Sequence, residues 1–226
     1  MAVLFVHHDA NSLPGHVGAV LAERGIDTVT HQVCHTPGSP VGSPEFPDPG
    51  RFGAIVVFGS RWSVNDPDAA HWVEPELEFL RLADRAAVPV LGLCFGGQVL
   101  AAAHGAKVER APAPEIGWFR VTSHDTEIEP GPWLQWHFDR FEVPPGATEL
   151  AVSPAGPQAF RLRHNLGLQF HPEADRAVIE SWFGDDIDQI VEVGVDPEEL
   201  LLETDRQHTA ARARAARLVD RFLDLR

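Results

Sequence analysis

A cysteine stands in a glycine-rich segment, Gly92–Gln98, between two apolar stretches of different periodicity. The run 87–91 before it indicates a buried strand, and the pattern over 98–104 after it is helical and ends at Gly105. Cys94 therefore falls at a sharp strand-to-helix turn, where glycine neighbours permit a strained backbone and close approach of a substrate. The helix N-terminus favours thiolate over thiol. Taken alone, however, a cysteine after a strand is more often a small core residue.

A histidine and a glutamate downstream supply what a cysteine nucleophile needs. Residues 166–170 indicate a short strand, which Pro172 ends because proline cannot continue a ladder. His171 and Glu173 are two positions apart and point to the same side of an extended backbone. The carboxylate can accept one ring N–H and leave the other nitrogen to take a proton from Cys94. An isolated His-Pro-Glu tripeptide is more often a surface turn, so the triad hypothesis depends on both segments.

Alternating strand and helix patterns predict the fold class. Short β-branched and apolar runs alternate with helical spacing, which predicts an α/β fold with a mostly parallel, open, flavodoxin-like sheet and helices on both faces. The expected strands are 3–6, 28–33, 54–58 and 88–91, and the expected helices are 16–24, 69–86 and 98–104. Later short strands predict a small antiparallel extension of the sheet, at 119–123, 148–152, 158–163 and 166–170.

The length of the chain and its helical patterns predict one domain followed by a C-terminal extension. Its 226 residues suffice for one α/β domain with a sizeable core, which we assign to residues 1–193, with a helix over 174–193. Residues 194–226 form a helical C-terminal extension, with one helix opening at Asp196 and a last amphipathic helix over 209–225. We expect this extension to pack on the domain; docking of a partner is the alternative, because amphipathic helices serve both uses.

The two motifs together resemble a known family. Gly-Leu-Cys-x-Gly-x-Gln at 92–98, followed by Gln-Phe-His-Pro-Glu at 169–173, resembles the class I, triad-type glutamine amidotransferases. The resemblance covers about residues 1–185 and is strongest to stand-alone domains similar to the GMP synthase glutaminase domain. Further similar segments are Val56–Asp66, which looks like the family's oxyanion loop, Glu115–Trp118, Trp136–Phe141 and Pro144–Ala147.

The resemblance implies a reaction for the triad. Cys94 attacks the side-chain amide of glutamine and forms a γ-glutamyl thioester. His171 acts as general base and then as the acid that protonates departing ammonia, and Glu173 orients His171. Water then releases glutamate.

The resemblance also implies an oxyanion hole, which needs two N–H donors. One is the backbone N–H of Phe95, directly after the nucleophile, and the other is that of Ser60. The family's usual Gly-Gly-Pro is Gly59-Ser60-Arg61 here, so Ser60 lacks the backbone freedom of a glycine.

Four residues are expected to bind the substrate. Gly59 belongs to the oxyanion loop, and Gln98 matches the motif glutamine that lies near bound substrate in the family. His137 and Asp139 fall where the family has a loop lining the glutamine pocket. For these last two, a solvated polar turn is the alternative.

Composition limits the partners. The formal net charge of −15 argues against nucleic acid and against anionic membrane surfaces. The two cysteines, Cys34 and Cys94, fit a reduced cytoplasmic setting better than a disulfide scaffold. The twelve histidines show no metal-binding spacing, and no phosphate-binding glycine loop occurs. We therefore expect no metal, no cofactor, no membrane span and a cytoplasmic protein.

Three functions stay open at this point. The first is hydrolysis of glutamine, with the ammonia passed to an acceptor synthetase in trans, because no synthetase segment follows the motifs. The second is hydrolysis of another γ-glutamyl peptide or amide by the same chemistry. The third is a non-catalytic regulatory subunit that keeps the fold.

Overall fold

The computed structural model describes residues 1–225, except for the side chains at 185, 186 and 189. The strands are β1 (Val3–His7), β2 (Thr28–Gln32), β3 (Ala54–Val57), β4 (Val90–Leu93), β5 (Val108–Ser123), β6 (Gly131–Phe141), β7 (Thr148–Ser153), β8 (Gly156–Leu162) and β9 (Asn165–Leu168). The helices are α1 (Gly15–Glu23), α2 (Ala70–Arg85), α3 (Phe95–Ala103), α4 (Arg176–Glu192) and α5 (Pro197–Leu223), with a 3-10 turn η1 (Pro49–Arg51).

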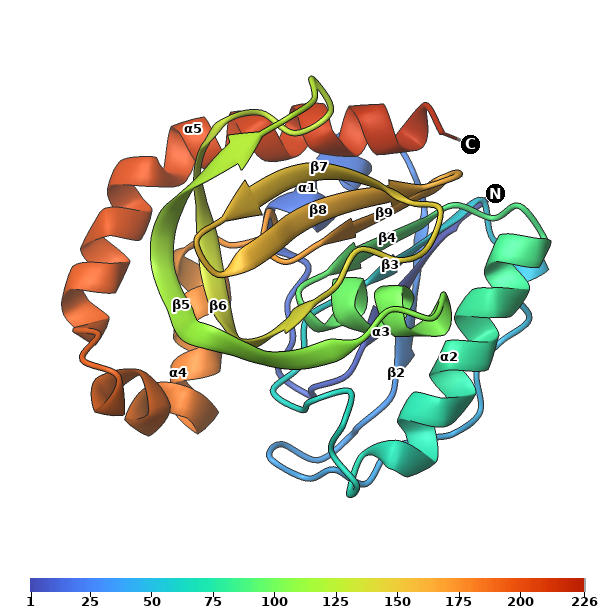
Figure 1. Cartoon of the computed structure of the whole chain (residues 1–226), viewed down its shortest axis with the longest axis horizontal. Coiled ribbons are helices and arrows are strands. Elements are labelled where there is room, and N and C mark those ends of the chain that lie inside the picture. The colour runs from blue at the N-terminus through green and yellow to red at the C-terminus, as the bar shows by residue number, and fades with distance from the viewer. Residues whose placement is uncertain (226) are drawn as a thin grey trace.

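The strands form one sheet in the order β2-β1-β3-β4-β9-β8-β7-β5-β6. The first five run parallel, and the last four continue the sheet in antiparallel fashion (Figure 1). Val57 pairs with Gly92, and Leu93 pairs with Leu168, so β3, β4 and β9 end at the same edge. The predicted α/β fold is confirmed, and this edge brings together the residues that follow three strands.

The parallel strands β1, β3, β4 and β9 are buried on both faces, whereas the edge strand β2 is largely exposed. Val3 and Phe5 of β1 pack in the cluster that contains α1 and α5, whereas Leu4 and Val6 pack in the cluster that contains α2 and α3. Figure 1 shows α2 and α3 in front of these strands and α1 behind them. Burial on both faces explains why these strands are nearly continuous apolar runs.

The antiparallel extension is larger than the sequence predicts. β5 and β6 form a long hairpin, and β6 was not expected as a strand. Its inward face carries Trp133, Gln135 and His137, which are all buried. Because two of these side chains are polar, the apolar alternation that marks a strand is broken. The expectation that His137 and Asp139 lie in a loop is therefore wrong: both are on β6.

The C-terminal region contains one long helix where two were expected. Asp196 caps α5 by accepting the N–H groups of Glu198 and Glu199, and the helix continues to Leu223. The hydroxyl of Thr204 donates to the Leu200 carbonyl and accepts from Trp118 Nε1 at 2.9 Å, which fastens α5 to β5.

The last turns of α5 belong to the main core. Leu218, Val219 and Phe222 pack in the same cluster as β1 and α1.

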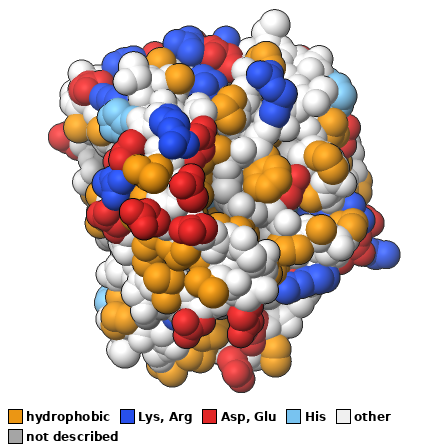
Figure 2. Space-filling view, turned by 90° about the vertical axis from the view of Figure 1, so that its left-hand side faces the viewer, with side chains coloured by type: hydrophobic (Ala, Val, Ile, Leu, Met, Phe, Trp, Pro, Cys, Tyr) orange, Lys and Arg blue, Asp and Glu red, His pale blue; other side chains and the backbone are white. Residues whose placement is uncertain are grey.

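The face of the molecule that carries α4 exposes hydrophobic side chains among acidic ones (Figure 2), including Ile187 and Val191. No helix within residues 1–225 is both long and apolar enough to cross a membrane.

Candidate active site

Cys94 adopts a strained conformation between β4 and α3. Its φ is +51° and its ψ is −107°, a region that residues other than glycine rarely adopt unless their surroundings enforce it. Its N–H donates to the Leu168 carbonyl at 2.9 Å, and its carbonyl accepts the Gln98 N–H at 3.0 Å. These bonds to β9 and α3 hold the thiol at the helix N-terminus, at the carboxyl edge of the parallel strands.

Two glycines let α3 lie directly on the sheet. A Cβ on Gly96 would stand 2.1 Å from the Val57 carbonyl oxygen, and one on Gly97 would stand 2.3 Å from the Leu168 carbonyl oxygen. Neither oxygen can move without moving its strand. A side chain at either position would push the start of α3, and Cys94 with it, off the sheet.

His171 and Glu173 form a buried pair beside this turn. Nδ1 of His171 lies 2.7 Å from Oε1 of Glu173, and the residues are 5 % and 2 % exposed. A carboxylate can only accept, so Nδ1 carries the hydrogen. The His171 N–H donates to the Leu134 carbonyl of β6 at 2.9 Å, and the indole of Trp182 lies with its centroid 4.8 Å from the imidazole centroid. Backbone, carboxylate and indole thus fix the ring.

The surroundings favour a positively charged His171. Burial alone lowers its pKa, but the Glu173 carboxylate and the Cys94 thiolate outweigh burial and raise the pKa to about 10. Nε2 is buried and has no well-aligned hydrogen-bond partner among the described residues. The site therefore favours the imidazolium form of His171.

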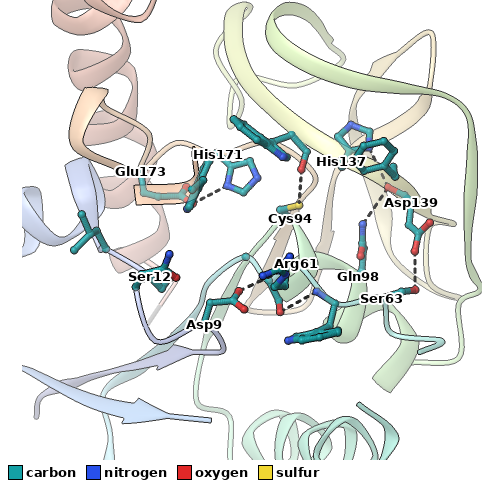
Figure 3. A pocket seen from close by; sticks show the side chains of 18 of the residues that line it. Asp9, Ser12, Arg61, Ser63, Cys94, Gln98, His137, Asp139, His171 and Glu173 are labelled. Carbon is teal, nitrogen blue, oxygen red and sulfur yellow. Dashed lines mark hydrogen bonds and ion pairs between the residues drawn. The ribbon is translucent and has the colours of Figure 1, made fainter. Parts of the chain in front are cut away.

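Gly59 lies between the two side chains. A Cβ on Gly59 would stand 2.9 Å from Cε1 of His171 and 3.8 Å from Cβ of Cys94. Sγ of Cys94 is 3.7 Å from the Trp136 carbonyl oxygen and points into the same cavity as His171 (Figure 3). The imidazole lies between Glu173 and Cys94 in that view. The structure thus brings the three predicted triad residues together.

The loop after β3 accommodates serine in place of glycine. Neither Gly59 nor Ser60 has a positive φ, so Ser60 carries no strain of the kind that requires glycine. The Asp9 carboxylate accepts the Arg61 N–H at 3.1 Å and the Ser60 hydroxyl, and that hydroxyl also accepts the Trp62 N–H at 3.3 Å. The departure from Gly-Gly-Pro is compatible with an ordered loop that faces Cys94.

A chain of amides connects the cysteine to β6. Nε2 of Gln98 donates to the Asp139 carbonyl at 3.0 Å and approaches Oε1 of Gln169 at 3.4 Å. Nε2 of Gln169 in turn lies 3.8 Å from Sγ of Cys94. Sequence reasoning gave Gln169 no role, although it precedes His171 by two positions in an extended segment and so faces the same side.

His137 and Asp139 line the cavity but are already engaged within the protein. His137 is 3 % exposed; its Nε2 lies 3.2 Å from Glu115 Oε2 and its Nδ1 lies 3.0 Å from the Asp139 carbonyl. The Asp139 carboxylate accepts from the Ser63 hydroxyl at 2.6 Å. Both residues therefore fasten β6 to its surroundings, and Glu115 is a buried member of this network that sequence reasoning missed.

The cavity in front of Cys94 measures about 530 Å³, within the range of small-molecule sites. Every predicted site residue except Phe95 lines it: Gly59, Ser60, Cys94, Gln98, His137, Asp139, His171 and Glu173. Residues without a predicted role in the site complete the wall: Asp9, Asn11, Ser12, Leu13, Arg61, Trp62, Ser63, Arg110, Trp136, Phe138, Trp182, Glu192 and Val193.

The second cysteine lies away from the cavity. Cys34 and Cys94 are both free thiols, and burial raises the pKa of Cys34 to about 11. A thiol with so high a pKa is a poor nucleophile, so Cys34 is a core residue. Across the described side chains, no cluster of His, Cys, Asp and Glu is arranged to hold a metal ion.

A strained cysteine at a strand-to-helix turn, beside a carboxylate-bound histidine at the carboxyl edge of a parallel sheet, defines an α/β protein with a candidate thiol nucleophile. The family model described as glutamine amidotransferase class-I matches residues 50–181, more than half of the chain. The chain belongs to the class-I glutamine amidotransferase family.

Curated relatives are longer proteins. The chain is 33 % identical over 143 residues to a GMP synthase [glutamine-hydrolyzing] of Staphylococcus carnosus, an alignment that covers 59 % of this chain and 26 % of that protein. It is 39 % identical over 105 residues to an aminodeoxychorismate synthase of Streptomyces griseus, covering 42 % and 14 %. The match thus spans about a quarter of the relatives' length or less.

Solved structures match the whole fold. A glutamine amidotransferase from Thermotoga maritima superposes with a TM-score of 0.86 over 99 % of this chain and 98 % of that chain, at 23 % identity. A glutamine amido transferase from Methylobacillus flagellatus gives a TM-score of 0.86 at 26 % identity, covering 99 % and 94 %. The extent of these matches includes α4 and α5, which lie beyond or at the end of the family-model match.

Proposed function

We propose that the protein hydrolyses the side-chain amide of glutamine. The Cys94 thiolate attacks the amide carbon, and the N–H groups of Ser60 and Phe95 stabilise the oxyanion. His171 then gives its proton to the nitrogen, the C–N bond breaks, and ammonia leaves behind a γ-glutamyl thioester on Cys94. Water, deprotonated by His171, attacks the thioester, and glutamate departs as the C–S bond breaks.

One observation carries the proposal. Cys94, held at φ +51°, and the ring of His171, held at 2.7 Å by Glu173, face one cavity across the single residue Gly59. Two separate segments thus supply the nucleophile on one side and the base with its orienting carboxylate on the other. The carboxylate accepts the Nδ1 hydrogen and leaves Nε2 for the proton transfers.

The ammonia needs an acceptor. The curated relatives are named as synthases, one of them glutamine-hydrolysing by name. We propose that an acceptor synthetase in trans takes the nitrogen, in the cytoplasm, where Cys94 stays reduced. This step can be tested by affinity capture with the wild-type chain as bait. The captured enzyme is then assayed for an amination reaction that glutamine supports.

The size of the cavity favours a second candidate, a γ-glutamyl amide with a larger amine. At roughly 30 Å³ per water, the cavity holds on the order of 18 water-sized groups, whereas glutamine has about ten non-hydrogen atoms. The leaving group lies on the side of His171, because His171 protonates it. Figure 3 places Ser12 on that side and Asp139 across Cys94 from it. Trp182, whose ring centroid lies 4.8 Å from that of the His171 imidazole, and Leu13, next to Ser12 in the chain, give this part of the wall an apolar character.

Ammonia release from glutamine, compared between wild type and Cys94→Ala, tests the reaction. We expect release by the wild type alone, labelling of Cys94 by a glutamine-directed electrophile, and retained glutamine binding in Cys94→Ala. Faster turnover of γ-glutamyl amides of larger apolar amines than of glutamine selects the second candidate. If the wild type hydrolyses neither glutamine nor the γ-glutamyl amides and Cys94 stays unlabelled, the result favours a non-catalytic regulatory subunit.

A further inference from the structure

A histidine and a glutamate form a second buried pair outside the triad. His8 directly follows β1, and Glu76 lies in α2. Nε2 of His8 is 3.0 Å from both carboxylate oxygens of Glu76, and both residues are 0 % exposed. Burying charged groups this completely costs folding free energy unless they are paired and hydrogen-bonded. The proposed reaction uses neither His8 nor Glu76.

The segment that carries His8 contacts both halves of the proposed oxyanion hole. The imidazole of His8 contacts the ring of Phe95 edge to face, with centroids 4.6 Å apart, and Phe95 carries one of the two proposed donors. Asp9, the next residue along the chain, accepts the Arg61 N–H at 3.1 Å. The segment of His8 and Asp9 is therefore in contact with α3 on one side and with the loop after β3 on the other.

The backbone of Gly59, in that loop, is a further neighbour that acts on His8. Nδ1 of His8 is buried and has no well-aligned hydrogen-bond partner among the described residues. Burial lowers the pKa of His8, but Glu76 outweighs it, and Asp9 and the backbone of Gly59 raise the pKa further. A backbone group that favours an imidazolium must accept its hydrogen, so the neighbour of the His8 ring is the Gly59 carbonyl.

The direction of that carbonyl sets the direction of the next N–H. The peptide between Gly59 and Ser60 is trans and planar, so its C=O and N–H point to opposite sides. The carbonyl points toward buried His8, whereas Gly59 and Ser60 line the cavity on the other side. The Ser60 N–H is thereby directed at the cavity.

We propose that His8, held by its buried contact with Glu76, is a positioning residue that aims the Ser60 N–H at the oxyanion. The inference rests on the proposed function, because it assumes a tetrahedral intermediate on Cys94. It assigns a role in the oxyanion hole to a residue that lies outside the two catalytic motifs. A neutral or tilted His8 releases the Gly59 carbonyl, and the peptide can then rotate away from the oxyanion.

Glu76→Gln is the sharpest test, because it keeps the shape and removes the charge; His8→Asn is the second variant. Loss of one oxyanion donor costs roughly 10²- to 10³-fold in kcat, so a misdirected donor is expected to lower kcat by about 10- to 100-fold. KM for glutamine stays within about twofold, as does the glutamine affinity of the Cys94→Ala, Glu76→Gln double variant by calorimetry. Both single variants are first shown to be folded by thermal unfolding.

Asp84→Asn is the matched control. Asp84 accepts from Asn165 at 2.8 Å in a polar network that lies away from the cavity. We expect it to lower the unfolding temperature and leave kcat within about twofold. Unchanged kcat in folded Glu76→Gln and His8→Asn overturns the inference, as does an equal kcat loss in Asp84→Asn.

A crystal structure of Glu76→Gln tests the same inference without turnover. A rotated or disordered peptide between Gly59 and Ser60 supports it, and an unchanged peptide overturns it. Failure of the wild type to hydrolyse any γ-glutamyl amide is a separate result, which overturns the proposed function and leaves the peptide orientation to decide the structural role of His8.

Discussion

Nδ1 of His171 donates to Oε1 of Glu173 across 2.7 Å, with both side chains almost completely excluded from water. This bond leaves Nε2 as the nitrogen for proton transfer and stabilises the imidazolium. Glu173→Gln keeps the volume but offers His171 a neutral amide, which can hold the wrong tautomer. We expect kcat to fall on the order of 10³- to 10⁴-fold, as for the equivalent change in a serine protease triad.

Steady-state kinetics of Glu173→Gln, with thermal unfolding to show that it folds, checks this expectation. Glu180→Gln is the control, because Glu180 is an exposed helix residue that pairs with Arg176. Its kcat is expected to stay within about twofold of wild type, since exposed pairs contribute roughly 0–1 kcal/mol. A Glu173→Gln enzyme within tenfold of wild type would show that the carboxylate does not orient the base.

The raised pKa of His171 also predicts how stability depends on pH. The pKa of His171 is about 10 in the folded protein and 6.5 in the unfolded chain. At a pH between these two values, the folded state therefore holds a proton that the unfolded state lacks. The stabilisation is fully present below about pH 6.5 and is lost as the pH rises toward about 10. Urea unfolding across this window, compared between wild type and His171→Gln, measures it. We expect the steeper decline in the wild type; parallel curves contradict the shift.

Most of the parallel half of the fold could be predicted because β1, β3 and β4 are buried on both faces. The apolar runs of β1, β3 and β4 and the helical spacing of α2 are local signals of that burial. β6 gave no such signal, because its inward side chains include polar groups paired with distant residues, as His137 is with Glu115. Its assignment needed contacts that no local window contains.

The candidate site, too, could be predicted only in part from the sequence. The turn at Cys94 and the pair His171 and Glu173 are contained in short motifs, whose joint resemblance to the glutamine amidotransferase family predicted that they meet. Gln169 could have been found from its position two residues before His171. The pair of His8 and Glu76 could not, because its partners are 68 residues apart and neither lies in a motif. Their relationship exists only once β1 and α2 pack on each other.

The C-terminal helix is expected to be needed for folding. Phe222 is 2 % exposed and packs in the cluster of β1 and α1, so Phe222→Ala is expected to lower the free energy of unfolding by about 3–5 kcal/mol. Leu202→Ala, on the same helix but 40 % exposed, is expected to cost about 0.5 kcal/mol or less. Urea denaturation of both variants measures the difference. Equal, small effects would indicate that residues 194–226 form a separable extension.

A last prediction concerns Gly97, where α3 rests on β9. In Gly97→Ala the new methyl group would stand 2.3 Å from the Leu168 carbonyl oxygen, a backbone atom that cannot yield. We expect a loss of about 1–3 kcal/mol of stability from overpacking. Because the same shift moves Cys94, kcat is expected to fall as well, by up to roughly 10²-fold for a displacement of about 1 Å.

Gly184→Ala provides the matched comparison, because a Cβ there meets no atom within 4 Å and the residue lies inside α4. Alanine is the better helix former by roughly 1 kcal/mol, so this variant is expected to gain stability and keep its kcat. Urea unfolding and glutamine turnover of the two variants, measured side by side, separate close packing from the general effect of replacing glycine. A Gly97→Ala protein with unchanged turnover would show that the position of Cys94 does not depend on the contact between α3 and β9.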